Sequence, residues 1–360
     1  MNKYATRPLV RVWAMLLCLC MAACVLLSSC QGGSEQPLSP GLQMIEGTPV
    51  FDEDVAMQTD HFTLTPGMMA YFFYTYGATV MAEMEAHKPF DSSKNLHGQM
   101  YNDTQSWYDV IMSETLAHVS YMLICCEAAY AEGVTLSADQ QKEVEQSVLA
   151  FRMTAATNYA MELEAYLQAL YGPQMTQEDL VLVLELETLA SSFSAVISDR
   201  LEASVSAAQA QEYAAQQGWS DSTPSRNVAY LFIPFENGVA PAGKITAVTS
   251  AMQGAPTVDT LRAQSAGTFG TEENLTPESS GVKQITDWLF DSTRSVGDWA
   301  RLDTEGATYF VLYVGNGIAF SEVQARRALF DAAYATWYNG WVAQLHFGYN
   351  YDCLDGYDAA

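Results

Sequence analysis

The hydrophobic pattern of the chain changes twice along its length, and these changes constrain its fold more than any other feature. Apolar residues in 62–218 recur at helical spacing, 225–315 mixes short strand-like and helical segments, and 322–345 returns to helical spacing. The return indicates that the last helix packs on the first helical region. The sequence therefore predicts an α+β fold, in which a small α/β domain is inserted into a mostly helical one.

Capping residues set the ends of the predicted helices. Thr65 can cap the first helix because it precedes Pro66, whose ring suits the first helical position. Gly218 ends the last helix of this region, since glycine readily adopts the left-handed conformation. Between these limits we predict further helices over about 104–132, 138–160, 176–201 and 207–217.

The middle region has the pattern of a small sheet with short helices. Residues 227–233 form an apolar run that is typical of a buried strand. Two more strands are predicted over 298–303 and 308–314, joined by a turn at residues 305–306. No regular structure is expected for 267–273. Short helices are predicted near 245–253, 258–266 and 282–292.

The first 29 residues have the pattern of a sorting signal rather than of a folded element. Basic residues near the start precede an apolar stretch over 12–27, which is too short to span a membrane comfortably. The stretch ends in Leu27-Ser28-Ser29-Cys30, which resembles the bacterial lipobox. That resemblance implies an extracytoplasmic protein anchored to the bacterial membrane by lipid on Cys30. An ordinary signal peptide or a short buried helix is the alternative.

The charge of the chain excludes two classes of partner. Sixteen basic residues stand against 42 acidic ones, which gives a net charge of −26, and removal of the basic leader would make it −29. Such a protein repels nucleic-acid phosphates and anionic lipid headgroups. We therefore expect no nucleic acid as partner, and we expect basic or neutral polypeptides to be favoured.

Cysteines and acidic clusters give no sign of a metal or a cofactor. Outside the leader and Cys30 the cysteines are Cys125, Cys126 and Cys353, an odd number without zinc-binding spacing. The first two are predicted to be apolar residues within a helix. The aspartates near the end of the chain lack the spacing of a calcium loop, so residues 349–360 are predicted to be an acidic tail.

Several segments, taken in order, resemble the SurA/PrsA-type foldases over about residues 62–348. These are extracytoplasmic chaperones that carry a parvulin-type peptidyl-prolyl isomerase domain, and the PrsA branch is lipid-anchored. The resemblance lies in the helical turn of residues 131–137, in Tyr171-Gly172 followed by Thr176-Gln177-Glu178, in the strand 226–233, and in Trp288-Leu289-Phe290-Asp291 with Gly297-Asp298.

The resemblance implies a division of the chain and a class of partner. Unfolded or proline-containing secreted polypeptides would be the partners, and the oligomeric state stays open. The implied parts are a lipoprotein signal (1–29), a lipid-anchored tether (30–61), a SurA-like helical chaperone domain (62–220), a degenerate parvulin-like domain (225–315), a C-terminal helix that packs on the helical domain (319–348) and the tail.

The residues that parvulins use for isomerisation are replaced here. The family carries one histidine on the first strand and one on the last, whereas all five histidines of this chain lie outside 225–315. The lost histidines fall at Tyr230 and Phe310, or at Ala229 and Tyr309 with a slip of one residue. A phenylalanine cannot donate the hydrogen bond. The resemblance thus implies an isomerase, but the sequence predicts that the activity is lost or depends on an uncommon site.

Two sets of apolar residues are candidates for polypeptide binding. Phe232, Trp288 and Phe290, with Tyr230 and Phe310, would form a proline-accepting pocket or else the core of a small domain. The first helix holds a second set, which would bind clients or form a helical core: Met68, Met69, Tyr71, Phe72, Phe73, Tyr74, Tyr76, Met81 and Met84. A surface lipoprotein that binds a ligand or scaffolds a partner is the competing functional hypothesis.

Overall fold

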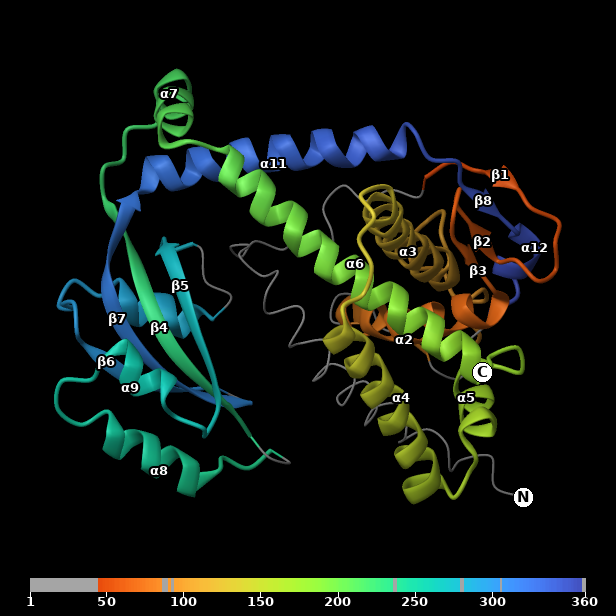
Figure 1. Cartoon of the computed structure of the whole chain (residues 1–360), viewed down its shortest axis with the longest axis horizontal. Coiled ribbons are helices and arrows are strands. Elements are labelled where there is room, and N and C mark those ends of the chain that lie inside the picture. The colour runs from red at the N-terminus through yellow and green to blue at the C-terminus, as the bar shows by residue number, and fades with distance from the viewer. Residues whose placement is uncertain are drawn as a thin grey trace. The chain divides into compact units, whose positions relative to one another are not determined.

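The computed structural model describes residues 45–85, 90–91, 94–235, 238–278, 282–304 and 306–357. The predicted signal, Cys30 and the first part of the predicted tether lie outside the described residues, as do Glu305 and Asp358. The described chain divides into two compact units (Figure 1). Residues 45–201 and 333–357 form the helical unit, and residues 202–332 form the sheet unit. The predicted α+β class is confirmed.

The helices of the helical unit begin close to where their caps predict. The amide of Met68 donates to the Thr65 hydroxyl at 3.1 Å, and the Ser106 and Ser137 side chains form capping boxes. The elements are α2 (Pro66–Glu85), α3 (Trp107–Ala131), α4 (Ala138–Tyr159), α5 (Leu163–Tyr171), α6 (Gln177–Ser204) and the end of α11 (Phe320–Val342).

The methionine and aromatic residues of α2 form core rather than an exposed client-binding surface. Five of them are at most 2% exposed: Met68, Met69, Tyr71, Phe72 and Phe73. Tyr74, Tyr76 and Met81 are half-buried against the same cluster, and the Met84 side chain lies outside the described residues. Cys125 and Cys126 of α3 are fully buried in it as well, and burial raises the pKa of the Cys125 thiol to about 12.

A small sheet joins the two ends of the described chain. Its strands are β1 (Thr48–Pro49), β2 (Met57–Gln58), β3 (Thr63–Leu64) and β8 (Gly348–Tyr349), in the order β1-β8-β2-β3. After β8 comes the short helix α12 (Tyr351–Leu354), and then Tyr357, whose hydroxyl donates to the Pro66 carbonyl at 2.8 Å. Residues 45–61 and 349–357 therefore belong to the fold, which corrects the predicted tether and tail. The sequence analysis did not predict these strands, because two residues are too few to show an alternating hydrophobic pattern.

Asp179 joins the start of α6 to the start of α2. Its Oδ1 accepts from the Thr65 hydroxyl at 2.6 Å, and its Oδ2 accepts from the Thr176 amide at 2.9 Å and the Thr176 hydroxyl at 2.7 Å. The approach is close, since a Cβ on Gly67 would lie 2.7 Å from Oδ2. One buried carboxylate thus satisfies donors at two helix N-termini.

The sheet unit contains a four-stranded antiparallel sheet in the order β5-β4-β7-β6. The strands are β4 (Pro224–Pro234), β5 (Thr268–Leu275), β6 (Trp299–Asp303) and β7 (Ala307–Ala319). Three were predicted, but β5 was missed because its sequence, TFGTEENL, carries polar residues and buries only Leu275. Its helices are α7 (Ala207–Gln217), α8 (Ala242–Ala251), α9 (Val258–Arg262) and α10 (Lys283–Leu289).

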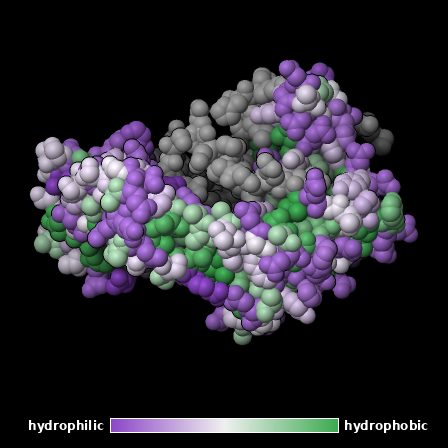
Figure 2. Space-filling view, turned by 90° about the horizontal axis from the view of Figure 1, so that it is seen from above, coloured by the Kyte–Doolittle hydropathy of each residue, from purple (hydrophilic) through white to green (hydrophobic). Residues whose placement is uncertain are grey.

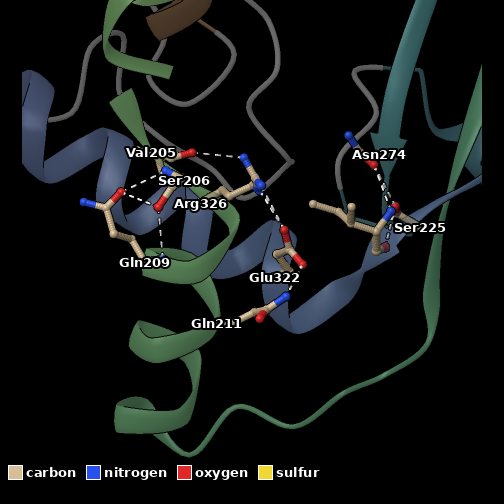
Figure 3. Close-up of polar contacts among 9 residues, drawn as sticks. Val205, Ser206, Gln209, Gln211, Ser225, Asn274, Glu322 and Arg326 are labelled. Carbon is tan, nitrogen blue, oxygen red and sulfur yellow. Dashed lines mark hydrogen bonds and ion pairs between the residues drawn. The ribbon is translucent and has the colours of Figure 1, made fainter. Parts of the chain in front are cut away.

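The strands β4 and β7, which are the first and last of this sheet along the sequence, pair at the point where the chain enters and leaves the sheet. Pro224 pairs with Ala319, and the Ser225 hydroxyl donates to the Ile318 carbonyl at 2.7 Å (Figure 3). Beside this point α7 packs on the first part of α11 through Ala210, Ala214 and Ala325. Arg326 of α11 donates to the Val205 carbonyl at 3.2 Å and to Glu322 at 2.9 Å.

Glu187 has no basic partner at ion-pair distance among the described residues, and burial changes its titration. Glu187 of α6 accepts from the Tyr71 hydroxyl at 3.3 Å. Burial raises the pKa of Glu187 to about 7, although the hydrogen bond from Tyr71 offsets part of this shift. The carboxyl of Glu187 therefore keeps its proton in the folded state at pH values where the unfolded chain has lost it.

This raised pKa predicts that the helical unit loses stability as the pH rises from about 4.5 to about 7. Over that range the folded state binds more protons at Glu187 than the unfolded state does, so the free energy of unfolding falls, by up to about 3 kcal/mol, and then levels off. Urea denaturation at several pH values measures it. Glu187→Gln keeps an acceptor for Tyr71 and should make this slope clearly shallower, whereas Glu202→Gln on the exposed end of α6 should leave it as it is. An unchanged slope in Glu187→Gln would contradict the assignment.

Candidate functional site

The register of the central strands decides which predicted site residues share a face of the sheet. Leu231 pairs with Phe310, and Phe232 pairs with Tyr309. Because side chains alternate between faces along a strand, Phe310 and Tyr309 point to opposite sides. Phe310 is fully buried with Leu231 under α8 and α9, whereas Tyr309 lies with Tyr230 on the α10 side. Tyr230 and Phe310 therefore do not form one site.

Three half-buried aromatic rings do come together on the α10 side of the sheet. The ring centroid of Tyr309 lies 6.3 Å from that of Tyr230 and 5.2 Å from that of Phe232. The residue that lies beside Tyr230 is thus Tyr309. It is the position of the second lost histidine when the alignment is shifted by one residue. The other slip position, Ala229, is fully buried on the opposite face.

Trp288 and Phe290 belong to the same apolar cluster as Tyr230 and Tyr309, but other side chains pack against their rings. The Arg226 guanidinium lies 5.1 Å from the Phe290 ring centroid, and Phe320 packs edge-on at 5.9 Å. The Arg294 guanidinium lies 5.3 Å from the ring centroid of Trp288. These contacts fit the packing of a small domain core better than an open proline pocket.

Glu272 on the edge strand β5 adds a carboxyl to this face, and sequence analysis missed it together with its strand. Glu272 lies opposite Val228 of β4. Burial raises the pKa of Glu272, and burial together with the nearby Glu272 charge raises the pKa of Tyr309. Both shifts favour the neutral form, so the face offers hydroxyl donors and apolar rings in place of the two histidines.

The space that Tyr230 occupies depends on a glycine in β5. A Cβ on Gly270 would lie 2.5 Å from Cζ and 2.6 Å from the hydroxyl oxygen of Tyr230. A glycine within a strand often marks such a close approach. Gly270 therefore lets the Tyr230 ring lie across the edge strand.

A second surface lies in the helical unit, where α4 and α6 leave an open groove of about 370 Å³. Val144 and Val148 of α4 face Val181 of α6, and Leu149 at the rim is 51% exposed. No predicted site residue lies here. The remaining side chains that line the groove are polar or charged: Gln141, Glu145, Arg152 and Glu185.

The helix that forms one wall of this groove is unusually apolar for its exposure. Only 28% of the most apolar segment of α6 is buried, against 72% for the core helix α3. Length and composition alone would let either helix span a membrane. On α6, Leu182 is 39% and Val196 is 47% exposed. Hydrophobic residues also reach the molecular surface in Figure 2, between hydrophilic ones.

The part of the chain that the structure describes holds no cluster of three or more histidine, cysteine or acidic side chains that could bind a metal ion.

Comparisons with known proteins give weak likenesses. No family model matches the chain, and no curated protein matches it. Among solved structures, one of two related SurA-like chaperones of Campylobacter jejuni is 9% identical, with a TM-score of 0.26, over 82% of this chain and 98% of that one. PrsA from Streptococcus pneumoniae is 12% identical (TM-score 0.30; 82% and 91%), and PrsA from Bacillus subtilis is 10% identical (TM-score 0.28; 86% and 94%). At these scores the likeness does not assign a function to the chain.

The close approach at Gly270 predicts a strong coupling between this residue and Tyr230. Gly270→Ala should destabilise the sheet unit by about 1–3 kcal/mol because the ring must move. The same change in a Tyr230→Ala background should cost much less, and a double-mutant cycle of denaturant unfolding measures the difference. Gly243→Ala, where a Cβ meets open space in α8, is the matched control and should not destabilise. Additive effects at 270 and 230 would contradict the described packing.

Proposed function

We propose that this protein is an extracytoplasmic folding chaperone of SurA/PrsA type that binds unfolded secreted polypeptides. The observation that carries the proposal is the open groove between α4 and α6, in which three valines and Leu149 lie among polar and charged side chains. Unfolded polypeptides expose apolar side chains, whose burial in such a groove is favourable. The order of helical and α/β segments along the sequence supports the same class.

The dimensions of the groove suit an extended segment. Gln141 and Arg152, at the two ends of its α4 wall, are eleven residues apart, which corresponds to about 16 Å along a helix. About five residues of extended chain cover that length. A short extended segment can therefore lie along the groove.

We further propose that lipid on Cys30 anchors the protein to the membrane. The motif around Cys30 supports this, and so does the net charge, since a chain at −26 is repelled by anionic headgroups and needs another means of attachment. The acidic surface would also keep a protein with exposed apolar side chains soluble.

For the sheet unit, we propose a role without isomerase catalysis. A catalyst of rotation about an X–Pro bond must lower a barrier of about 18–20 kcal/mol by favouring the twisted amide. Here Phe310 is buried on the far face, and Tyr230 and Tyr309 stand in an apolar cluster without histidine. A fold can persist after its catalytic site is lost.

Client binding predicts that the processed chain (residues 30–360, with Cys30→Ser) slows the aggregation of a denatured secreted protein. Leu149→Asp in the groove should weaken client binding about tenfold, since it places a charge among apolar groups. Val296→Asp is the matched control, because Val296 is 59% exposed in the sheet unit. Light scattering and peptide anisotropy measure the two effects. Equal activity of both variants would remove the groove from the proposal.

The competing hypothesis, a lipoprotein that scaffolds a partner, predicts a different result. A pulldown from the cell envelope would then yield one folded partner in fixed stoichiometry, and the processed chain would leave aggregation unchanged. A range of unfolded clients supports the chaperone.

Loss of the isomerase site predicts that the processed chain does not accelerate a refolding reaction limited by proline isomerisation. The measured rate should equal the uncatalysed rate, which has a time constant of about 10–100 s at 25 °C, and Tyr230→Phe and Tyr309→Phe should not change it. An acceleration that disappears in either variant would show that these hydroxyls form an uncommon isomerase site.

A further inference from the structure

We infer that the groove between α4 and α6 selects apolar client segments that carry one lysine or arginine. The inference rests on the proposed binding of unfolded polypeptides and specifies which segments this surface prefers. The occupant to which it commits is a short extended stretch of an unfolded protein, and the argument follows from the charges that line the groove.

Two carboxylates on facing helices line the groove together. Glu145 lies on α4 and Glu185 on α6, beside the valines of the floor. Among the described residues, neither carboxylate has a lysine or arginine at ion-pair distance, although exposed ion pairs occur elsewhere, as between Arg200 and Glu132 at 2.8 Å. Neither of these two carboxylates therefore has an ion-pair partner among the described residues.

The basic residue of the groove stands away from Glu145. Arg152 lies seven residues further along α4, about 10 Å by helix geometry. Its guanidinium is within hydrogen-bonding distance of the Gln177 side chain, at 3.5 Å. Arg152 thus marks the opposite end, where a backbone carbonyl or an acidic residue of the client would be favoured and a second cation would not.

The apolar floor lies directly next to these charges. Val144 is buried one position before Glu145, and Val148 and Val181 are half-buried. A client segment that places apolar side chains on the valines brings its neighbouring side chains to the carboxylates. A long lysine or arginine stem can cover apolar surface while its charged end reaches Glu145 and Glu185.

Binding itself strengthens the charge preference. A bound segment excludes water from the groove, so that the two carboxylates lose part of their hydration. A neutral segment leaves this loss uncompensated, and an acidic one adds repulsion. Exposed ion pairs each contribute little, and two of them acting on one cation correspond to a preference of about tenfold.

The test compares three labelled peptides that share one apolar sequence and differ at a central lysine, glutamine or glutamate. Fluorescence anisotropy with the processed chain should give an affinity about tenfold higher for the lysine peptide than for the glutamine peptide, and lower again for the glutamate peptide. This ratio should shrink in 0.5 M salt because screening weakens exposed ion pairs.

Two double variants with equal net charge distinguish an effect of the groove carboxylates from an effect of the overall negative charge. Glu145→Gln with Glu185→Gln should reduce the lysine-to-glutamine ratio to about one. Glu143→Gln with Glu202→Gln removes two exposed carboxylates from the same helices outside the groove and should leave the ratio unchanged. Equal ratios in both double variants would overturn the inference and assign the preference to the overall charge.

The remaining outcomes distinguish the inference from the proposed function. If the processed chain binds all three peptides with equal affinity, the charge selection is wrong and client binding stands. If none of the peptides binds, and aggregation of a denatured protein is also unaffected, the proposed function fails and the inference fails with it.

Discussion

The antiparallel pairing of β4 with β7 is the constraint on which the rest of the sheet unit depends. These two strands are central in the sheet and supply buried residues to both of its faces. They are also the strands by which the chain enters and leaves it, since Pro224 pairs with Ala319. The hydrogen bond from the Ile318 amide to Oδ1 of Asn274, at 3.0 Å, fixes the edge strand at the same point. Because the two ends of this insertion pair with each other, the segments that lead into β4 and out of β7 begin side by side.

The same pairing explains why the aromatic residues of this unit do not form the pair that sequence comparison proposes. Side chains alternate along a strand, so a shift of one residue moves a side chain to the other face of the sheet. Phe310 lies under α8 and α9 with Leu231, and its neighbour Tyr309 stands beside Tyr230. A sequence alignment without histidines to anchor it cannot distinguish these two registers, whereas hydrogen-bonded pairing does.

Sequence reasoning predicted the long elements well because their signals are local. Capping residues such as Thr65, Ser137 and Gly218 mark the ends of helices by their own hydrogen bonds or backbone conformation. The strand β5 escaped because it lies at an edge and buries almost none of its side chains. The short strands β1 and β8 escaped because each exists only through its partner, 300 residues away in the sequence.

The groove between α4 and α6 could not be predicted for a related reason. Val144 and Glu145 are ordinary neighbours on a polar helix, and nothing in their sequence tells which face meets α6. Only the packing of the helices brings Glu145 and Glu185 to the same opening. The candidate site is therefore a product of tertiary structure, while the apolar character of α6 itself was visible in the sequence.

The pairing of β8 with β1 and β2 has a consequence for the order of folding. During synthesis, which proceeds from the N-terminus, Thr48 and Met57 are present long before Gly348 and Tyr349, with which they pair. The helical unit therefore completes its fold only after the whole sheet unit has been synthesised, because contacts between distant residues form late. During that interval the first helices expose apolar surface that the completed fold buries.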